Sequence, residues 1–152
     1  MLPHLPYPPT LLTRQTALEL ARDASRFAAA QNIDTDPPAT EANLINSFSD
    51  YRAHADGRVS EAAQIAADWA DAHHIAHSRL LLGEFGAMQS PDDTAQDQAS
   101  RLRFLRAKAL SAQSLGIGWA VWSCFGSFDI SDGMVNRRPD GAVCQAIGLL
   151  CR

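Results

Sequence analysis

The segment with the clearest chemical potential is residues 80–87, which read Leu-Leu-Leu-Gly-Glu-Phe-Gly-Ala and place one carboxylate, Glu84, between two glycines. The run of leucines predicts a strand that is buried on both faces, as in a parallel sheet under helices. Glycines relieve crowding where the main chain turns, and they let another group approach closely. Because α/β folds carry their chemistry at the carboxyl ends of parallel strands, Glu84 is a candidate catalytic residue. The alternative is a solvated glutamate at a strand end.

A second segment, residues 117–123, reads Ile-Gly-Trp-Ala-Val-Trp-Ser and has the aromatic and β-branched content of a strand. Alternation along a strand puts Trp119 and Val121 on one face and Ala120 and Trp122 on the other. We interpret Trp119 as a core residue. Trp122 lies on the opposite face, and on its own it could be a second core tryptophan.

Two groups of residues could suggest metal or redox chemistry. His73, His74 and His77 lie near the end of a predicted helix, where histidines also suit the helix dipole. No carboxylate or cysteine is properly spaced beside them, so we expect no metal and no cofactor. The cysteines are Cys124, Cys144 and Cys151. Their number is odd and their spacing is not that of a metal site, so we interpret them as buried or idle thiols, with a Cys144–Cys151 bridge as the alternative.

The elements that would position these residues alternate along the chain. Helices are predicted over residues 10–30, 41–53, 60–74, 91–115 and 141–150. The candidate cap of the first helix is Thr10 or Thr13, and Asp56-Gly57 is expected to end the second. Residues 32–40 are expected to be a loop. From Ser60 onward the order is helix, strand, helix, strand, helix, which predicts an α/β fold with parallel strands.

The helix over residues 91–115 carries the clearest signals. Ser90-Pro91-Asp92-Asp93 has a capping hydroxyl, a proline and two acids, which predicts a helix start, and Gly116 predicts its end. Its inner face is predicted to consist of Leu102, Leu105, Ala109 and Ala112. Arg101, Arg103, Arg106 and Lys108 are expected to point mostly outward.

Composition excludes several classes of function. The chain has 152 residues, is 46% hydrophobic and 20% charged, and carries a formal charge of -4. These values are those of globular protein, and the absence of a basic surplus argues against nucleic-acid binding. No apolar run approaches the ~20 residues of a membrane span. Residues 1–9 lack the pattern of a signal peptide and read as a proline-stiffened loop from inside a longer protein.

Taken together, the motifs resemble the C-terminal part of a glycoside hydrolase family 5 enzyme, the cellulase-type (β/α)8 barrel. The matching pieces are Gly83-Glu84-Phe85-Gly86, Arg101, Gly116-Ile117-Gly118-Trp119-Ala120-Val121-Trp122-Ser123, Phe128-Asp129-Ile130, Ala146-Ile147-Gly148-Leu149 and Leu5-Pro6-Tyr7-Pro8-Pro9. Their order agrees with strand seven, helix seven, strand eight and helix eight of that barrel. Residues 10–56 match only loosely.

The resemblance implies a single partial hydrolase domain over residues 1–152, with a loop at 1–9, a helical region at 10–78 and the site within 79–152. Glu84 would be the nucleophile of a retaining glycosidase, and Trp122 the platform under the sugar. The substrate would be a β-glucan or related β-linked polysaccharide, and Trp69 would pack its helix on the barrel wall. Members of the family are commonly secreted, but this chain carries no signal-peptide pattern, so its location stays open.

The chain departs from the family pattern in one important respect. The family's acid/base lies in an Asn-Glu-Pro motif after strand four, and the sequence contains no Asn-Glu-Pro. A complete barrel takes about 250 residues and eight strands, so this barrel is incomplete. The chain is a fragment or one half of a split enzyme, and alone it is expected to be inactive. Its exposed sheet face should lead it to self-associate or to pair with an N-terminal barrel half.

Two other classes of function stay open at this point. One is a non-catalytic remnant that binds carbohydrate or a protein partner. The other is a small α/β domain that resembles the family by chance. The family motif favours descent from a hydrolase, whereas the missing acid/base argues against activity of the isolated chain. The combined spacing of two motifs argues against a chance resemblance.

Overall fold

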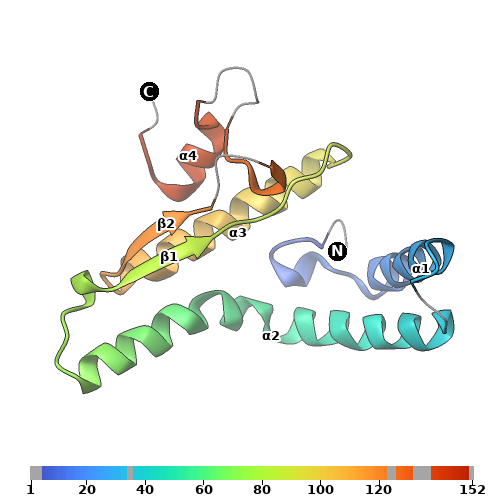
Figure 1. Cartoon of the computed structure of the whole chain (residues 1–152), viewed down its shortest axis with the longest axis horizontal. Helices are drawn as coiled ribbons and strands as arrows, with labels where there is room; N and C mark the ends of the chain where they lie inside the picture. The colour runs from blue at the N-terminus through green and yellow to red at the C-terminus, as the bar shows by residue number, and fades with distance from the viewer. Residues whose placement is uncertain (1–4, 34–35, 123–125, 132–137, 151–152) are drawn as a thin grey trace. The chain divides into compact units, whose positions relative to one another are not determined.

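The computed structural model describes residues 5–33, 36–122, 126–131 and 138–150. The chain divides into two compact units, Met1–Asp56 and Gly57–Arg152, which are described separately below. In order, the elements are the short turn η1 (Pro9–Leu11), α1 (Arg14–Ala30), α2 (Pro37–Ala72), η2 (His77–Arg79), β1 (Leu81–Phe85), α3 (Ala95–Ser114), β2 (Gly118–Val121), η3 (Gly126–Phe128) and α4 (Gly141–Ile147). Figure 1 shows these elements along the chain.

The first unit is helical and has its own small core. Thr13 caps α1 by accepting a hydrogen bond from the amide of Thr16 at 3.0 Å, which confirms one of the two predicted caps. The core consists of Leu12, Ala21 and Phe48, all almost completely buried. The apolar face of α1 and the first part of α2 are therefore packed within this unit.

Helix α2 differs from the prediction at its start and in its middle. It begins at Pro37, so the loop predicted to reach residue 40 ends earlier. Proline is tolerated in the first turn of a helix, where its missing N–H would have no partner. The predicted break at Asp56-Gly57 is also wrong, because the helix continues through Gly57 to Ala72. A single glycine costs only about 1 kcal/mol inside a helix, which a long helix can absorb.

The second unit is α/β, as the alternation of elements predicts. β1 and β2 form a two-stranded parallel sheet, with Leu81 opposite Gly118 and Leu82 opposite Trp119. Helix α3 connects the two strands and lies along them in Figure 1. The parallel pairing of the two predicted strands is confirmed.

Two apolar clusters cover one face of this sheet, which we call the core face. The first comprises Phe85, Leu105, Ala109, Val143 and Ile147, with Leu82, Trp119 and Val121 packed against it. The second comprises Ala63, Ala67, Ala112 and Ile117. Trp119 contacts both, and its ring lies edge-on to Phe85 with centroids 5.7 Å apart. Its predicted role as a core residue is confirmed.

The other face of the sheet, which we call the open face, carries Leu81, Gly83 and Ala120, all exposed. Leu81 keeps 67% of its surface accessible. The prediction that the leucine run is buried on both faces is therefore wrong: α3, α4 and the last part of α2 cover only one side. Trp69 is also 50% exposed and stacks on His73, so the expectation that it packs its helix on a barrel wall is not met within the described residues.

Helix α3 starts later than Ser90-Pro91-Asp92-Asp93 predicts. Thr94 is the N-cap, and it forms a capping box in which Asp97 and Thr94 each accept a bond from the other's backbone amide. The reciprocal pair satisfies two amides at once, which favours Thr94 over Ser90 as the cap. The predicted end is confirmed: Gly116, with φ +71°, follows the C-cap Leu115. Helix α4 ends at Ile147, earlier than predicted, because Gly148 adopts a left-handed conformation.

Candidate active site at the carboxyl edge of the sheet

A bulge in β1 determines where Glu84 lies. Leu82 pairs with Trp119 and Phe85 pairs with Val121, so three steps along β1 match two steps along β2. Because side chains alternate between faces, this extra residue allows both Leu82 and Phe85 to contact the core face. Gly83 and Glu84 lie between them and are exposed. The bulge therefore keeps the carboxylate out of the apolar core.

Trp122 follows β2 at the edge where both strands end, which we call the carboxyl edge. Its amide donates to the carbonyl oxygen of Phe85 at 2.7 Å, so the main chains of the two strands stay paired one residue past β2. Val121 packs on the core face, and alternation then turns Trp122 toward the open face. The Trp122 side chain is 51% exposed. The sequence-predicted pair, Glu84 and Trp122, thus lies at one edge of the sheet, on its uncovered side.

Gly86 lies against the main chain of Trp122. A Cβ atom at position 86 would collide with the carbonyl oxygen of Trp122, and it would stand 3.0 Å from Cδ1 of Phe128. A glycine is therefore required here by the close approach of two backbones. The glycines that flank Glu84 differ in this respect, because nothing lies within 4 Å of a Cβ built at Gly83.

Arg101 is the residue of this region that the sequence reasoning placed wrongly. It is 6% exposed, not outward-facing. Its Nε donates to the carbonyl oxygen of Ala87 at 3.1 Å, and a terminal nitrogen donates to the carbonyl oxygen of Asp129 at 2.5 Å. A signal was available, because Arg101 precedes the buried Leu105 and Ala109 at four-residue steps and shares their helix face.

Charges around Arg101 offset part of the cost of burying a cation. Burial lowers the pKa of the guanidinium, and the nearby carboxylates of Asp140, Asp93 and Asp129 act in the opposite direction. Asp129 is held ionised mainly by the backbone amide of Ser131, which donates to its Oδ1 at 2.8 Å and lowers the pKa of that carboxyl. Arginine stays protonated in proteins, so the site contains a fixed buried positive charge.

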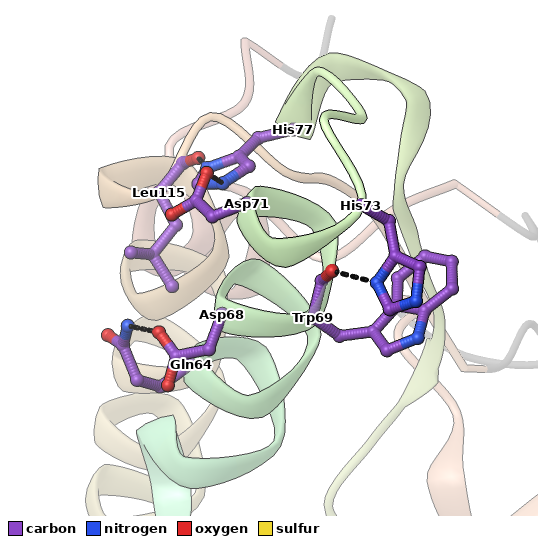
Figure 2. Close-up of polar contacts among 7 residues, drawn as sticks. All are labelled: Gln64, Asp68, Trp69, Asp71, His73, His77 and Leu115. Atoms are coloured by element: carbon purple, nitrogen blue, oxygen red, sulfur yellow. Dashed lines mark hydrogen bonds and ion pairs between the residues drawn. The ribbon is translucent and has the colours of Figure 1, made fainter.

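Two of the three histidines considered for metal binding, His73 and His77, have other partners (Figure 2). His77 Nδ1 lies 2.7 Å from the carbonyl oxygen of Leu115, and its Nε2 lies 2.9 Å from Oδ1 of Asp71. The hydrogen bond to Leu115, with that to Asp71, raises the pKa of His77 above its ordinary value of 6.5. His73 Nδ1 contacts the carbonyl oxygen of Trp69 at 2.7 Å. Among the described residues, no group of His, Cys, Asp and Glu could hold a metal ion.

The histidine cluster also lies away from the candidate site. His77 belongs to η2, which precedes β1, whereas Glu84 lies near the end of β1. His77 joins the end of α2, through Asp71, to the end of α3, through Leu115. It therefore stabilises the edge of the sheet that is opposite the carboxyl edge.

Cys144 is disulfide-bonded, so the interpretation of the cysteines as free thiols is wrong for this residue. Its two possible partners, Cys124 and Cys151, lie outside the described residues. Cys144 itself is buried on α4, next to the cluster that supports β1. The disulfide thus involves the helix that packs on α3.

The chain matches no protein-family model, no curated protein and no solved structure. None of the helices in the described part of the chain has the length and apolar character needed to cross a membrane. The class that the structure defines is α/β, with two parallel strands covered on one face by helices.

Proposed function

We propose that this chain is the C-terminal part of a retaining glycoside hydrolase of the cellulase type, with Glu84 as nucleophile. In this proposal α2, β1, α3, β2 and α4 correspond to helix six, strand seven, helix seven, strand eight and helix eight of a (β/α)8 barrel. The open face of the sheet would then line the interior of the barrel. An N-terminal half would supply the other strands and the acid/base.

The observation that carries the proposal is the bulge in β1, which directs Glu84 away from the core face at the carboxyl edge. Bulges occur preferentially at barrel rims and beside active sites, where they re-aim a side chain. A glutamate with no chemical role could equally occupy a regular strand. Here the main chain departs from regular pairing at the very residue that would do the chemistry.

In this proposal Glu84 and Trp122 have different roles, one in the chemistry and one in binding the sugar. In a retaining enzyme a carboxylate attacks the anomeric carbon and forms a covalent glycosyl intermediate, while a second carboxylic acid ~5–5.5 Å away protonates the leaving oxygen. Glu84 is an exposed carboxylate suited to the first role. Trp122 offers a half-exposed indole on which the C–H face of a sugar ring could pack.

The test is reconstitution of activity from two halves. The full chain would be combined with a family 5 N-terminal half that carries strands one to six and the Asn-Glu-Pro motif. Hydrolysis of a soluble β-1,4-glucan is expected from the mixture and from neither half alone. Glu84→Gln should then lower kcat by several orders of magnitude, because the covalent intermediate can no longer form.

The matched control is Glu61→Gln, an exposed glutamate on α2 in the same unit. It should leave the reconstituted rate unchanged. Turnover by the unaided chain, or full rate in the Glu84→Gln mixture, would contradict the role of Glu84. Labelling of the mixture with a 2-fluoroglycoside and recovery of the sugar on a peptide containing residue 84 would identify the nucleophile directly.

A second candidate function rests on the exposure of Trp122 alone. If the chain is a non-catalytic binding piece, it should bind β-linked oligosaccharides without any N-terminal half, since the 51% exposed indole is already accessible. Titration of the isolated chain with cello-oligosaccharides distinguishes the two proposals: binding that depends on Trp122 but not on Glu84 favours the binding piece.

A further inference from the structure

The feature of the second unit that neither fold nor proposed chemistry explains is the buried guanidinium of Arg101. Burying a charge is costly unless it is paired and hydrogen-bonded. Arg101 is 6% exposed, and it donates hydrogen bonds to two main-chain carbonyl oxygens, those of Ala87 and Asp129. An apolar side chain at this position would avoid the free-energy cost of burying a charge. A role for the cation is therefore expected in the segments that it contacts.

Those two segments follow the two strands. Ala87 lies just after β1, and Asp129 lies just after η3 in the segment that follows β2. The two acceptors lie 14 residues before and 28 residues after Arg101 in the sequence, yet they share its one planar donor group. The same two segments also touch directly, because the amide of Gln89 donates to the carbonyl oxygen of Ser127 at 2.6 Å.

We propose that Arg101 is a positioning residue, which sets the spacing of the segments at residues 87–89 and 127–129 that flank Glu84 and Trp122. A guanidinium presents several N–H donors in a rigid plane, so two acceptors that bind it are held at a fixed separation. A lysine ammonium on a flexible stem fixes no such separation. Only the choice of Glu84 and Trp122 as the residues between these segments rests on the proposed function.

Neighbouring contacts explain why the spacing needs this support. The strands themselves are held by pairing as far as the hydrogen bond from Trp122 to Phe85. Beyond that point, one backbone hydrogen bond joins the two segments among the described residues, the one from Gln89 to Ser127. Arg101 adds two charge-assisted bonds from beneath, and so joins both segments to the rigid helix α3.

Hydrogen-exchange mass spectrometry on the full chain tests this without any sugar or activity. The variants are Arg101→Lys, which keeps the charge, and Arg101→Met, which removes it. The control is Arg106→Met, an exposed arginine on the same helix. Losing a hydrogen bond to a charged group predicts exchange on the order of 10- to 100-fold faster in the peptide over residues 86–94.

The comparison peptide covers residues 102–114 of α3. Faster exchange in 86–94 with unchanged exchange in 102–114, in Arg101→Lys and not in Arg106→Met, would support the proposal. Unchanged exchange in 86–94, or an equal rise in both peptides, would overturn it, because Arg101 would then be irrelevant or merely part of global stability. Arg101→Lys keeps the test valid if Arg101→Met fails to fold. Failure of the glycosidase proposal would leave this result untouched, since no step depends on hydrolysis.

Discussion

Gly86 and Trp122 are in backbone contact: the carbonyl oxygen of Trp122 stands where a side chain at position 86 would begin. The contact closes the end of the parallel pair, just past the amide-to-carbonyl bond from Trp122 to Phe85. Because the Trp122 main chain already touches the Gly86 main chain, it cannot move closer to β1. The position of the Trp122 indole is therefore set by this backbone contact. This relationship makes the carboxyl edge sensitive to very small changes.

Gly86→Ala should destabilise the second unit. The added methyl group must displace either the Trp122 main chain or Phe128, and overpacking of this kind costs about 1–3 kcal/mol. Urea denaturation followed by tryptophan fluorescence measures the loss. The control is Gly57→Ala on α2, where a Cβ meets nothing within 4 Å and helix propensity should add about 0.5–1 kcal/mol. Equal effects of the two substitutions would contradict the close approach.

His77 should make the stability of the second unit depend on pH. Neutral imidazole has one N–H, whereas the protonated ring can donate to both the Leu115 carbonyl and the Asp71 carboxylate. The pKa of His77 is raised in the folded state, so the native protein binds the proton more tightly. The stabilisation is therefore full below about pH 6.5 and is lost as the pH rises through the folded pKa.

The measurement compares urea midpoints at about pH 5.5 and about pH 8. The natural chain should be more stable at the lower value, and His77→Asn should remove most of that difference. His73→Asn serves as the control, because His73 bonds through Nδ1 to the carbonyl oxygen of Trp69 and stacks on the Trp69 ring, and among the described residues it contacts no carboxylate. A pH dependence that survives His77→Asn would show that another group is responsible.

Trp122→Ala should weaken glycan binding by the reconstituted hydrolase while leaving its chemistry in place. An aromatic contact of this kind is worth about 0.5–1.5 kcal/mol, so the affinity should fall roughly 2- to 10-fold. Trp69→Ala is a closely matched control, since Trp69 is 50% exposed and Trp122 is 51% exposed. Isothermal titration with a cello-oligosaccharide gives both affinities. Equal losses in the two variants would remove Trp122 from the proposed site.

Leu81→Gln should reduce self-association of the isolated chain. Leu81 is 67% exposed on the open face, and an exposed apolar sheet face favours contact with another chain. Burying a leucine is worth about 1.5–3 kcal/mol, so the association constant should fall by about tenfold or more. Leu110→Gln, at a 49% exposed position on α3, should have little effect. Sedimentation velocity measures both, and a monomeric natural chain would contradict the expectation.

The sequence predicted the features that depend on local pattern. The two strands, their parallel pairing and the helix end at Gly116 follow from apolar runs and from glycine at a left-handed position. The uninterrupted α2 did not follow, because a single glycine is a weak signal that helix cooperativity overrides. The start of α3 was misplaced because two capping patterns overlap, and only the one at Thr94 is reciprocal.

The sequence was sufficient to nominate Glu84 and Trp122 as candidates, Trp122 through the family resemblance, but it did not predict the geometry around them. The direction of Glu84 depends on a bulge, which no alternation pattern in the leucine run reveals. Arg101 was misjudged because charge suggested solvent, although its four-residue spacing from Leu105 and Ala109 placed it on the buried face.

The bulge in β1 also gives this segment one residue more than regular pairing with β2 needs. Removing Gly83 would leave Leu82 and Phe85 two residues apart, opposite Trp119 and Val121, so strict alternation would keep both on the core face and Glu84 on the other face. Substitutions at Gly83 meet open space and should be mild as well. In a regularly paired strand, the loss of one residue turns every later side chain to the opposite face. At position 83 a one-codon deletion should therefore be tolerated far better than a deletion elsewhere in the strand.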